Sequence, residues 1–321
     1  MARVFVTGGA GFIGSHICER ILDLGHEVVC FDNLITGFEE NIEHLKMHDG
    51  FRFIKGDIRE LNQVREGMEG CTHVSHQAAL GSVPRSIQDP LRTNEINISG
   101  SLNVLSEAQK KSVERFVFAS SSSVYGDNPD MPKVESKVGR LLSPYAVTKA
   151  SFEEYARVYN QIHGSCTIGL RYFNIFGPKQ SPSGAYAAVI PLFMKHLSKK
   201  ERPTIFGDGE QTRDFTYVEN AVEANILSLF GDVPYAFGKT FNVACGETLT
   251  INRIYNEILK VINEKMDIGD IKPIYDAPRS GDIKDSLADL SEANRFLGYA
   301  PIVNFSAGIK HTVNWFLESK A

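Results

Sequence analysis

The first half of the chain alternates short apolar runs, rich in β-branched and aromatic residues, with longer stretches of helical spacing. The short runs are predicted to be buried strands and cover Arg3–Val6, Glu27–Phe31, Phe51–Lys55, His73–His76, Arg115–Ala119 and Thr167–Arg171. The stretches between them are predicted to be helices and cover His16–Gly25, Asn62–Glu69, Thr93–Lys111 and Pro144–His163. Because strands and helices alternate, we expect an α/β fold, a doubly wound parallel sheet with helices on both faces.

This alternation ends near residue 175, after which loops rich in Gly and Pro separate short helices. The only clear later strand is Thr240–Ala244. We therefore expect a smaller, mixed α/β second domain, packed closely on the first because no repeat or linker divides the chain. The two domains are expected to be interleaved, with residues 1–174 and about 215–250 in the first and about 175–214 and 251–321 in the second.

The charge balance narrows the class of partner. The 321 residues include 39 Asp and Glu against 34 Lys and Arg, for a formal net charge of −5. A surface that binds DNA, RNA or an acidic membrane normally carries a basic excess, so none of these is an expected partner. With 42% apolar and 23% charged residues, the composition also excludes disorder and fibrous repeats, which leaves a small-molecule enzyme as the leading class.

The cysteines and the apolar segments bear on the compartment. Five cysteines are scattered along the chain without a Cys-x-x-Cys pair or a cluster with histidines, a pattern typical of reduced thiols in the cytoplasm, and no metal site is expected. The apolar start of the chain is too short for a signal peptide. No stretch approaches the ~18 apolar residues of a membrane span. We expect a cytoplasmic protein.

A glycine-rich loop follows the first predicted strand and opens the first helix. It runs from Thr7 to Gly14, with glycines at positions 8, 11 and 14. Gly8 permits the tight turn, Gly11 lets the backbone approach a pyrophosphate, and Gly14 lets the helix pack on the strand. The free N–H groups and the positive dipole end of that helix then face the phosphates. The loop predicts a dinucleotide cofactor and a Rossmann-type sheet.

Asp32 favours NAD over NADP as that dinucleotide. It ends the second strand, 18 residues beyond Gly14, where a carboxylate accepts a hydrogen bond from the adenosine 2′-hydroxyl and repels a 2′-phosphate. The simpler interpretation is that Asp32 is a strand-end turn residue. Asp57 and Ile58, after the third strand, are expected at the adenine edge of the same crevice, although Gly56-Asp57 is also an ordinary turn.

Tyr145 and Lys149 are the candidate catalytic pair. Ser143 and Pro144 begin a helix, which puts Tyr145 and Lys149 on one face. Such pairs are common on helix surfaces, but a serine loop at residues 120–123 follows the fifth strand, whose carboxyl end opens onto the cofactor crevice. The Lys149 ammonium and a cationic nicotinamide would lower the tyrosine pKa from near ~10 by roughly one to three units. A serine hydroxyl would then hydrogen-bond the reacting oxygen.

Motifs spread along the chain add a family resemblance. They are Thr7–Gly14, Asp32–Leu34, Gly56–Arg59, His76–Ala79, the serine loop ending in Val124-Tyr125-Gly126, Tyr145-x-x-x-Lys149, Arg171–Gly177, Gly207–Gly209, Arg213–Phe215 and Arg279–Asp282. Together they resemble the extended short-chain dehydrogenase/reductases over almost the whole chain, in the nucleotide-sugar 4-epimerase branch. The segments Ala78–Ser86 and Gly184–Pro191 are similar to epimerases that prefer N-acetylated UDP-hexosamines.

The resemblance implies an isomerase that uses NAD to invert C4 of a UDP-sugar through a 4-keto intermediate. Tyr145 would take the proton from the C4 hydroxyl, Ser121 would hydrogen-bond that oxygen, and Lys149 would hold the nicotinamide ribose. The implied NAD-binding residues are Gly8, Gly11, Phe12, Ile13, Gly14, Asp32, Asn33, Asp57, Ile58, Gln77, Ala78, Ala79, Tyr145 and Lys149. The implied substrate-binding residues are Gly81, Ser82, Ser122, Ser123, Asn174, Ala188, Val189, Arg213, Arg279, Asp282 and Ser286.

Some of these substrate residues also have simpler interpretations. Arg213 and Arg279 match diphosphate contacts but could be surface arginines, and Asn174 matches another but could be a turn residue. Asp282 matches the uridine-ribose contact. Ser286 stands where glucose- and galactose-restricted epimerases carry a bulky side chain, so it leaves room for an N-acetyl group at C2, although it could merely begin a helix.

The expected function is 4-epimerisation of UDP-GlcNAc and UDP-GalNAc, extending to UDP-Glc and UDP-Gal. A UDP-hexuronate epimerase, acting on UDP-GlcA or UDP-GlcNAcA, stays open because Ser82, Ser122 or Arg85 could serve either sugar. A nucleotide-sugar decarboxylase or dehydratase is disfavoured, since Ser122 and Ser123 stand where those relatives carry acidic residues. A non-catalytic NAD sensor is disfavoured by the intact catalytic residues.

The resemblance also implies a homodimer. Its expected interface is the pair of helices Thr93–Lys111 and Pro144–His163. The second helix carries Phe152, Tyr155, Tyr159 and Ile162 at helical spacing, a stripe that is equally consistent with a plain core face.

Overall fold

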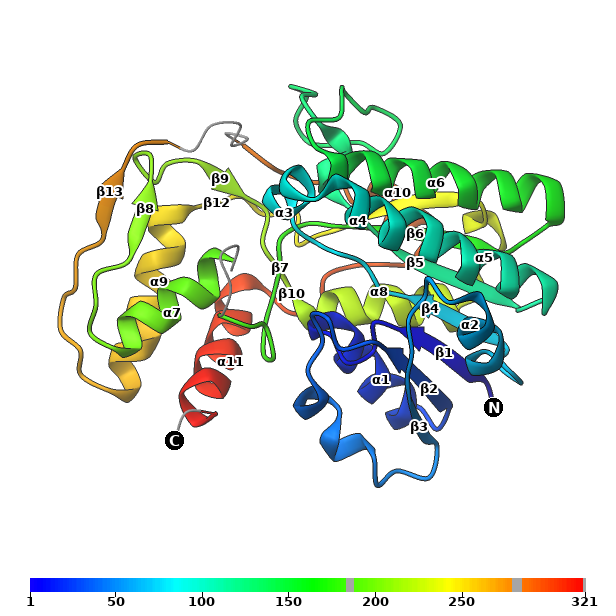
Figure 1. The fold of residues 1–321 in the computed structure, drawn as a ribbon. Coiled ribbons are helices and arrows are strands. Elements are labelled where there is room, and N and C mark those ends of the chain that lie inside the picture. Colours follow the sequence, from blue (N-terminus) through cyan, green and yellow to red (C-terminus); the bar gives the residue numbers. More distant parts are fainter. Residues whose placement is uncertain (183–187, 279–284, 320–321) are drawn as a thin grey trace.

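The computed structural model describes residues 1–182, 188–278 and 285–319. Its centre is a seven-stranded sheet in which every neighbouring pair is parallel, with strand order β11-β6-β5-β4-β1-β2-β3 (Figure 1). The strands are β1 (Arg3–Thr7), β2 (Glu27–Asp32), β3 (Phe51–Lys55), β4 (His73–His76), β5 (Arg115–Ser121), β6 (Thr167–Tyr172) and β11 (Lys239–Val243). They correspond to the seven predicted strands, so the predicted Rossmann-type α/β fold is confirmed.

Helices cover both faces of this sheet. One face carries α2 (Leu61–Gly67), α5 (Ser101–Lys110) and α6 (Pro144–His163), and the other carries α1 (Phe12–Asp23) and α8 (Val218–Phe230). Successive residues of β1 show why both faces need a cover: Val4 and Val6 join one buried cluster and Phe5 joins the other. Each fully buried side chain of this size contributes about 1.5–3 kcal/mol, which holds the layers together.

The predicted helix Thr93–Lys111 is longer and less regular than expected. It begins earlier, as α4 (Pro90–Asn94), because Asp89 caps it by accepting a hydrogen bond from the Arg92 N–H at 3.1 Å. It then widens into a π-helical turn over Glu95–Gly100 before α5 continues. Wide turns of this kind often reposition side chains at functional sites, and this one carries Asn97, whose contacts are described below.

A smaller lobe is built from α7 (Val189–Ser198), α9 (Ile251–Lys265) and α11 (Phe305–Glu318), which pack on one another (Figure 1). Three pairs of short strands join the lobes or border the smaller one: β7 (Ile175–Phe176) with β10 (Thr216–Tyr217), β8 (Thr204–Phe206) with β13 (Ile274–Asp276), and β9 (Thr212–Arg213) with β12 (Leu249–Thr250). The prediction that Thr240–Ala244 is the only clear later strand was therefore wrong. These strands are two or three residues long, too short for a periodic signal.

The chain crosses between the lobes more than once. After β6 it builds part of the smaller lobe and returns to the sheet with α8 and β11. The helix α10 (Ser291–Leu297) also packs on β11 and α8, which places it beside the sheet and not with the rest of the segment 251–321. The short helix α3 (Val83–Gln88), which follows β4 in the chain, packs on α6. Because all the sheet strands are parallel, their carboxyl ends lie along one edge of the sheet. β2 and β4 lie on opposite sides of β1, so the chain connections from β1 diverge at this edge.

Candidate active site

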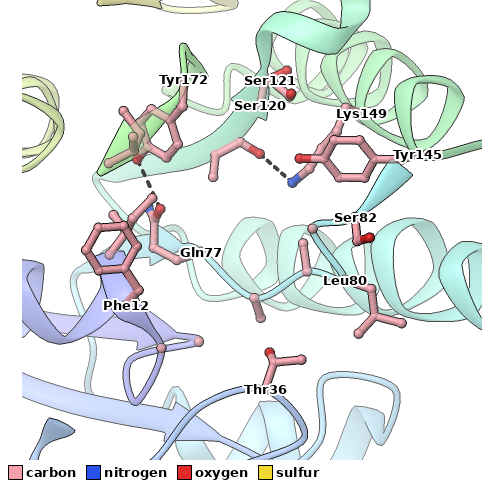
Figure 2. Close-up of a pocket in the computed structure, with 18 of the residues that line it drawn as sticks. Phe12, Thr36, Gln77, Leu80, Ser82, Ser120, Ser121, Tyr145, Lys149 and Tyr172 are labelled. Atoms are coloured by element: carbon pink, nitrogen blue, oxygen red, sulfur yellow. Dashed lines mark hydrogen bonds between the residues drawn. The ribbon is translucent and has the colours of Figure 1, made fainter. Parts of the chain in front are cut away.

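A cavity of about 830 Å³ lies at the carboxyl edge of the sheet. Its wall draws on the ends of β1, β2, β4, β5 and β6 and on Arg213 and Ser286 of later segments. Figure 2 shows Phe12, Gln77, Leu80, Ser82, Tyr145 and Tyr172 around this space. Thirteen of the fourteen predicted NAD-binding residues line it, all except Asp57, so one cavity brings together motifs that are far apart in the sequence.

The glycine loop is fitted to a close approach of a ligand. Gly8 has φ +67°, in the left-handed region, and a Cβ there would lie 2.7 Å from the Ala78 nitrogen. A Cβ on Gly14 would press on the Gly8 carbonyl, with the Gly8 carbonyl carbon and the Gly9 Cα both at 2.9 Å. The first turn of α1 carries no side-chain cap, and Gly11, Phe12 and Ile13 line the cavity. Free N–H groups at that helix end are the donor set that a dinucleotide pyrophosphate needs.

Asp32 serves two purposes at the end of β2. Its carboxylate accepts hydrogen bonds from the Ala10 N–H at 3.0 Å and the Leu34 N–H at 2.8 Å, so it braces the glycine loop and starts the following turn. It also lines the cavity, and burial raises its pKa. Each carboxylate oxygen keeps a second lone pair for a ribose hydroxyl, so the two interpretations of Asp32 are compatible. The residues therefore fit NAD.

The turn after Asp32 contributes residues that sequence reasoning missed. Ile35, Thr36 and Phe38 line the cavity, and the Phe38 N–H donates to the Ala10 carbonyl at 3.0 Å. Their only sequence signal is that they follow Asp32 in a loop. That loop is held against the glycine loop by a hydrogen bond between distant residues.

Asp57 does not itself line the cavity, and its place at the adenine edge stays a prediction. Its carboxylate accepts hydrogen bonds from the Arg59 side chain and from Asn33 Nδ2, at 3.0 Å for the latter. These contacts, with Arg59 the largest, lower its pKa to about 2. Asp57 therefore braces Asn33 from behind, while Asn33 and Ile58 line the cavity themselves.

The candidate catalytic residues meet at the end of β5. Ser143 caps α6 by accepting a hydrogen bond from the Ala146 N–H at 3.1 Å, which sets Tyr145 and Lys149 on one face of the helix. Lys149 Nζ donates to the Ala119 carbonyl at 2.8 Å and lies 6.0 Å from the centre of the Tyr145 ring. Figure 2 shows both side chains beside Ser121. Ser121 Oγ accepts a hydrogen bond from the Ser123 N–H at 3.1 Å.

The electrostatics of this pair differ from expectation in one respect. Burial lowers the pKa of Lys149 to about 8, opposed by the charge of Glu153. Burial also raises the pKa of Tyr145, and a hydrogen bond with Ser121 acts against that rise. The predicted lowering of the Tyr145 pKa is therefore not a property of the protein residues alone, because desolvation outweighs them.

Two buried side chains, Ser86 and Asn97, connect the helix α6, which carries Tyr145 and Lys149, to neighbouring segments of the cavity wall. Ser86 Oγ, on α3, accepts a hydrogen bond from the Tyr145 N–H at 3.1 Å. Asn97 Oδ1, in the π-helical turn, accepts from the Leu80 N–H at 2.8 Å, while its amide donates to Thr148 Oγ1 at 3.1 Å. Neither position has a sequence signal that separates it from an ordinary polar helix residue.

A ring of hydrogen bonds forms the opposite wall. Tyr172 donates to Gln77 Oε1 at 3.0 Å, Gln77 Nε2 donates to Asn225 Oδ1 at 3.1 Å, and Asn225 Nδ2 donates to the Tyr172 oxygen at 2.7 Å (Figure 2 draws the first bond). Burial raises the pKa of Tyr172. Tyr172 thus stays a neutral hydroxyl that orients Gln77, a role the sequence did not indicate.

The predicted substrate residues divide into three groups. Gly81, Ser82, Ser122, Ser123, Asn174, Arg213 and Ser286 line the cavity. Ala188 and Val189 stand at the start of α7 and do not line it, so their contact with the substrate stays a prediction. Arg279 and Asp282 lie outside the described residues.

Asn174 and Arg213 show how the far side of the cavity is shaped. Asn174 adopts a positive φ of 39°, and its amide donates to the Asp214 carbonyl at 2.9 Å, so it is both a turn residue and part of the wall. Arg213 Nη1 donates to the Thr212 carbonyl at 2.8 Å. Thr212 in turn donates to Asp285 Oδ1 at 2.7 Å, which fixes the strand that carries Arg213 beside Ser286.

The described part of the chain has neither a candidate metal cluster nor a candidate membrane-spanning helix. Within residues 1–182, 188–278 and 285–319, no three His, Cys, Asp or Glu side chains gather where they could hold a metal ion. In the same residues, no helix has the length and apolar character needed to cross a membrane.

Comparisons with known proteins agree with this geometry. The profile of the "NAD dependent epimerase/dehydratase family" matches residues 4–244. A putative UDP-glucose 4-epimerase of Methanocaldococcus jannaschii is 35% identical over 314 residues, which are 97% of each chain.

Two solved structures are similar over nearly their whole length. A UDP-N-acetylglucosamine 4-epimerase from Methanobrevibacter ruminantium M1, in complex with UDP-N-acetylmuramic acid, is 40% identical, covers 99% of both chains and has a TM-score of 0.92. A UDP-glucuronic acid 4-epimerase from Bacillus cereus, in complex with UDP-glucuronic acid and NAD, is 29% identical, covers 99% of both chains and has a TM-score of 0.88. The chain therefore belongs to the NAD dependent epimerase/dehydratase family and is an NAD-using isomerase of its UDP-sugar 4-epimerase group.

Proposed function

We propose that this protein interconverts UDP-GlcNAc and UDP-GalNAc by inverting C4, with UDP-Glc and UDP-Gal as further substrates. The observation that carries the proposal is the convergence of Ser121, Tyr145 and Lys149 on one cavity with the glycine loop and Ser286. Ser286 lines that cavity, and its small side chain supports the proposal that an N-acetyl group at C2 is accommodated there. The 40% identity with the M. ruminantium enzyme supports the same substrate class.

The chain's residues divide the work of proton handling and orientation. NAD, when bound, supplies a hydride acceptor that can return the hydride to either face of C4. Tyr145 takes and returns the proton of the C4 hydroxyl, and Ser121 hydrogen-bonds that oxygen. Lys149 is charged below its pKa of about 8, and its ammonium stabilises the negative charge that forms on the tyrosine oxygen. Arg213 holds the diphosphate while the sugar turns over.

Elimination and decarboxylation are less well supported. The described carboxylates in the cavity wall are Asp32, which braces the glycine loop, and Asp285, which accepts from Thr212. Within the described part of the chain, neither belongs to the serine loop, where the neighbours of Ser121 are hydroxyls. Proton donation to a leaving hydroxyl at C6 therefore lacks an acid in that loop.

A UDP-hexuronate is the second candidate substrate, and Arg85 is the observation that favours it. Arg85 lines the cavity one turn of α3 beyond Ser82, and its guanidinium has no hydrogen-bond or ion-pair partner among the described residues. By comparison, Lys133 in the same wall donates to the Asn128 carbonyl. A cation without a partner is suited to a sugar carboxylate. Arg85→Ala should then weaken UDP-GlcA turnover at least tenfold and leave UDP-GlcNAc turnover nearly unchanged.

Product analysis tests the two candidates together. Purified protein is incubated with UDP-GlcNAc, UDP-Glc or UDP-GlcA, and the products are identified by NMR. Formation of UDP-GalNAc at the highest kcat/KM supports the first proposal, and a preference for UDP-GlcA supports the second. Release of CO₂, formation of a 4-keto-6-deoxy sugar, or no turnover of any substrate would contradict the epimerase function.

We also propose a homodimer and a cytoplasmic location. The helices α3, α4 and α6 expose Ile87, Leu91 and Ile162 by 62%, 78% and 69%, apolar side chains that a second copy could cover. The predicted stripe on α6 splits, because Phe152 is buried while Tyr155 is exposed. Leu91→Asp should convert a dimer to a monomer in light scattering, and a monomeric wild type would contradict the proposal.

The proposed cytoplasmic location rests on the free thiols of all five cysteines.

A further inference from the structure

A buried ion pair lies directly behind the catalytic residues. Glu153, on α6, accepts hydrogen bonds from Arg171, on β6, at 2.9 Å from Nε to Oε1 and 2.7 Å from Nη2 to Oε2. The side chains are only 10% and 7% exposed. This two-point contact fixes both the distance and the angle between the catalytic helix and the sheet.

Glu153 is also connected to the strand that carries the catalytic serine. Its carboxylate accepts a hydrogen bond from Ser120 Oγ. Ser120 lies between Ala119, whose carbonyl accepts from Lys149 Nζ, and Ser121. Because Glu153 follows Lys149 by one helical turn on the same face, α6 is joined to the end of β5 at two successive levels.

Arg171 extends the same connection to the other end of the serine turn. Its Nη1 donates to the Glu135 carbonyl at 3.0 Å, and its guanidinium lies 4.9 Å from the centre of the Tyr125 ring. Tyr125 closes the serine turn and donates to Asn242 Oδ1 at 2.6 Å. The ion pair therefore contacts the strand before Ser121 and the turn after it.

Stability alone does not account for this arrangement. Apolar residues of similar volume often replace a buried ion pair with no loss of stability, because the desolvation of the charges offsets their attraction. We propose that Glu153, held by Arg171 and Ser120, is a positioning residue that keeps the Lys149 ammonium charged and fixed relative to Ser121. The proposal deepens the proposed function, since Lys149 acts in that reaction.

Among the charged and titratable groups of the described residues around Lys149, Glu153 is the one that favours the charged form of the Lys149 amine. From α6, Tyr145 and Glu153 flank Lys149, and from β5 it meets the Ala119 carbonyl. From β4 comes His76, whose ring nitrogens contact Thr7 Oγ1 and Ser101 Oγ and whose pKa burial lowers to about 3, so it is neutral. From β6 comes Arg171, whose charge Glu153 neutralises. Glu153 acts to raise the pKa of Lys149 against the effect of burial.

The test measures the titration of Lys149 directly. Protein labelled with [ε-¹³C]lysine is titrated by NMR, and the Lys149 signal is identified by its absence in Lys149→Met. We expect a wild-type midpoint at about pH 8 and a midpoint lower by about one unit in Glu153→Gln. Glu154→Gln is the matched control, because Glu154 is the next residue of the helix, is exposed and pairs with Arg157. It should titrate as the wild type does.

Glu153→Asp separates charge from position. It keeps the carboxylate but is one methylene shorter, so it cannot reach Ser120 and Arg171 together. We expect a Lys149 midpoint close to the wild-type value, a kcat at least tenfold lower with KM changed less than threefold, and weaker NAD binding. If Glu153→Gln does not fold, Glu153→Gln/Arg171→Met removes both charges at a smaller cost to folding. It should still shift the Lys149 midpoint downward, but by less than Glu153→Gln does, because the opposed charge of Arg171 is removed as well.

Two results would overturn the proposal: a wild-type Lys149 midpoint in folded Glu153→Gln or in the double variant, or wild-type NAD affinity and kcat in Glu153→Asp. Failure of the proposed function is distinguishable from both. A wild-type protein that turns over no UDP-sugar would contradict the epimerase function, while the Lys149 midpoint and the NAD dissociation constant would still decide the role of Glu153.

Discussion

Replacing Gly14 by alanine is the smallest change that should separate the fold from cofactor binding. Gly14 lies in the first turn of α1, where it packs on Gly8 and Gly9. The added Cβ would press on the Gly8 carbonyl oxygen, with two further backbone atoms at 2.9 Å. Backbone atoms cannot rotate away as a flexible side chain can, so the loop and the helix start must move apart.

The magnitude follows from the cost of overpacking. Forcing one extra carbon into a tightly packed site costs about 1–3 kcal/mol. If all of this cost must be met to hold the glycine loop in the shape that binds the pyrophosphate, NAD affinity falls roughly 5- to 140-fold, at about 1.4 kcal/mol for each factor of ten. The three atoms nearest to the new methyl group belong to Gly8 and Gly9 and not to a sheet strand, so the protein should still fold.

The assay is the NAD dissociation constant by calorimetry, together with the melting temperature. Gly164→Ala is the control, because a Cβ there meets nothing within 4 Å, although Gly164, unlike Gly14, has a positive φ of 68°. It should lower the melting temperature through backbone strain and leave NAD affinity unchanged. An NAD affinity of Gly14→Ala within twofold of wild type would show that the glycine loop tolerates the added Cβ and that this close contact does not set cofactor binding.

Three further outcomes are expected. Tyr145→Phe should keep NAD and UDP-sugar binding but lower kcat by about 10²–10⁴, and near-normal turnover would mean that another base acts. Because Lys149 is charged below its pKa of about 8 and neutral above it, kcat measured from pH 6 to pH 10 should fall as the pH rises through about 8; a flat profile would argue against the ammonium. Ser143→Ala should remove the α6 cap and cost about 0.5–2 kcal/mol in urea unfolding; an unchanged midpoint would show that Pro144 suffices.

The sheet could be predicted from the sequence because its strands are short runs that alternate with segments of helical spacing. The predicted strands Phe51–Lys55 and His73–His76 have the observed boundaries. β4 is buried along its whole length, while β3, at the edge of the sheet, is only partly buried. The glycine loop and the Tyr145–Lys149 spacing were equally visible, because each is local in sequence.

Features that depend on distant partners could not be predicted. β9 and β12 are two residues long and exist because Arg213 meets Leu249. The π-helical turn lies in a segment whose spacing indicates an ordinary helix, and the contacts of its Asn97 with Leu80 and Thr148 appear only in three dimensions.

The candidate site was partly predictable for the same reason. Asp57 follows a strand as Asp32 does, yet Arg59 and Asn33 hold it behind the wall and not in it. Glu153 looked like one of several acidic residues on a helix until its contacts with Ser120 and Arg171 were known. A strand end indicates which loops form a site, but side-chain contacts decide which residues face it.

Isotope retention at C4 tests the central claim most directly. UDP-GlcNAc carrying deuterium at C4 is incubated with the protein in ordinary water, and the UDP-GalNAc formed is examined by NMR and mass spectrometry. If hydride leaves C4 and returns within the same site, the product keeps its deuterium at C4 in the inverted configuration. Loss of the deuterium to solvent, or recovery of UDP-GlcNAc alone, would contradict C4 epimerisation by the Tyr145 site.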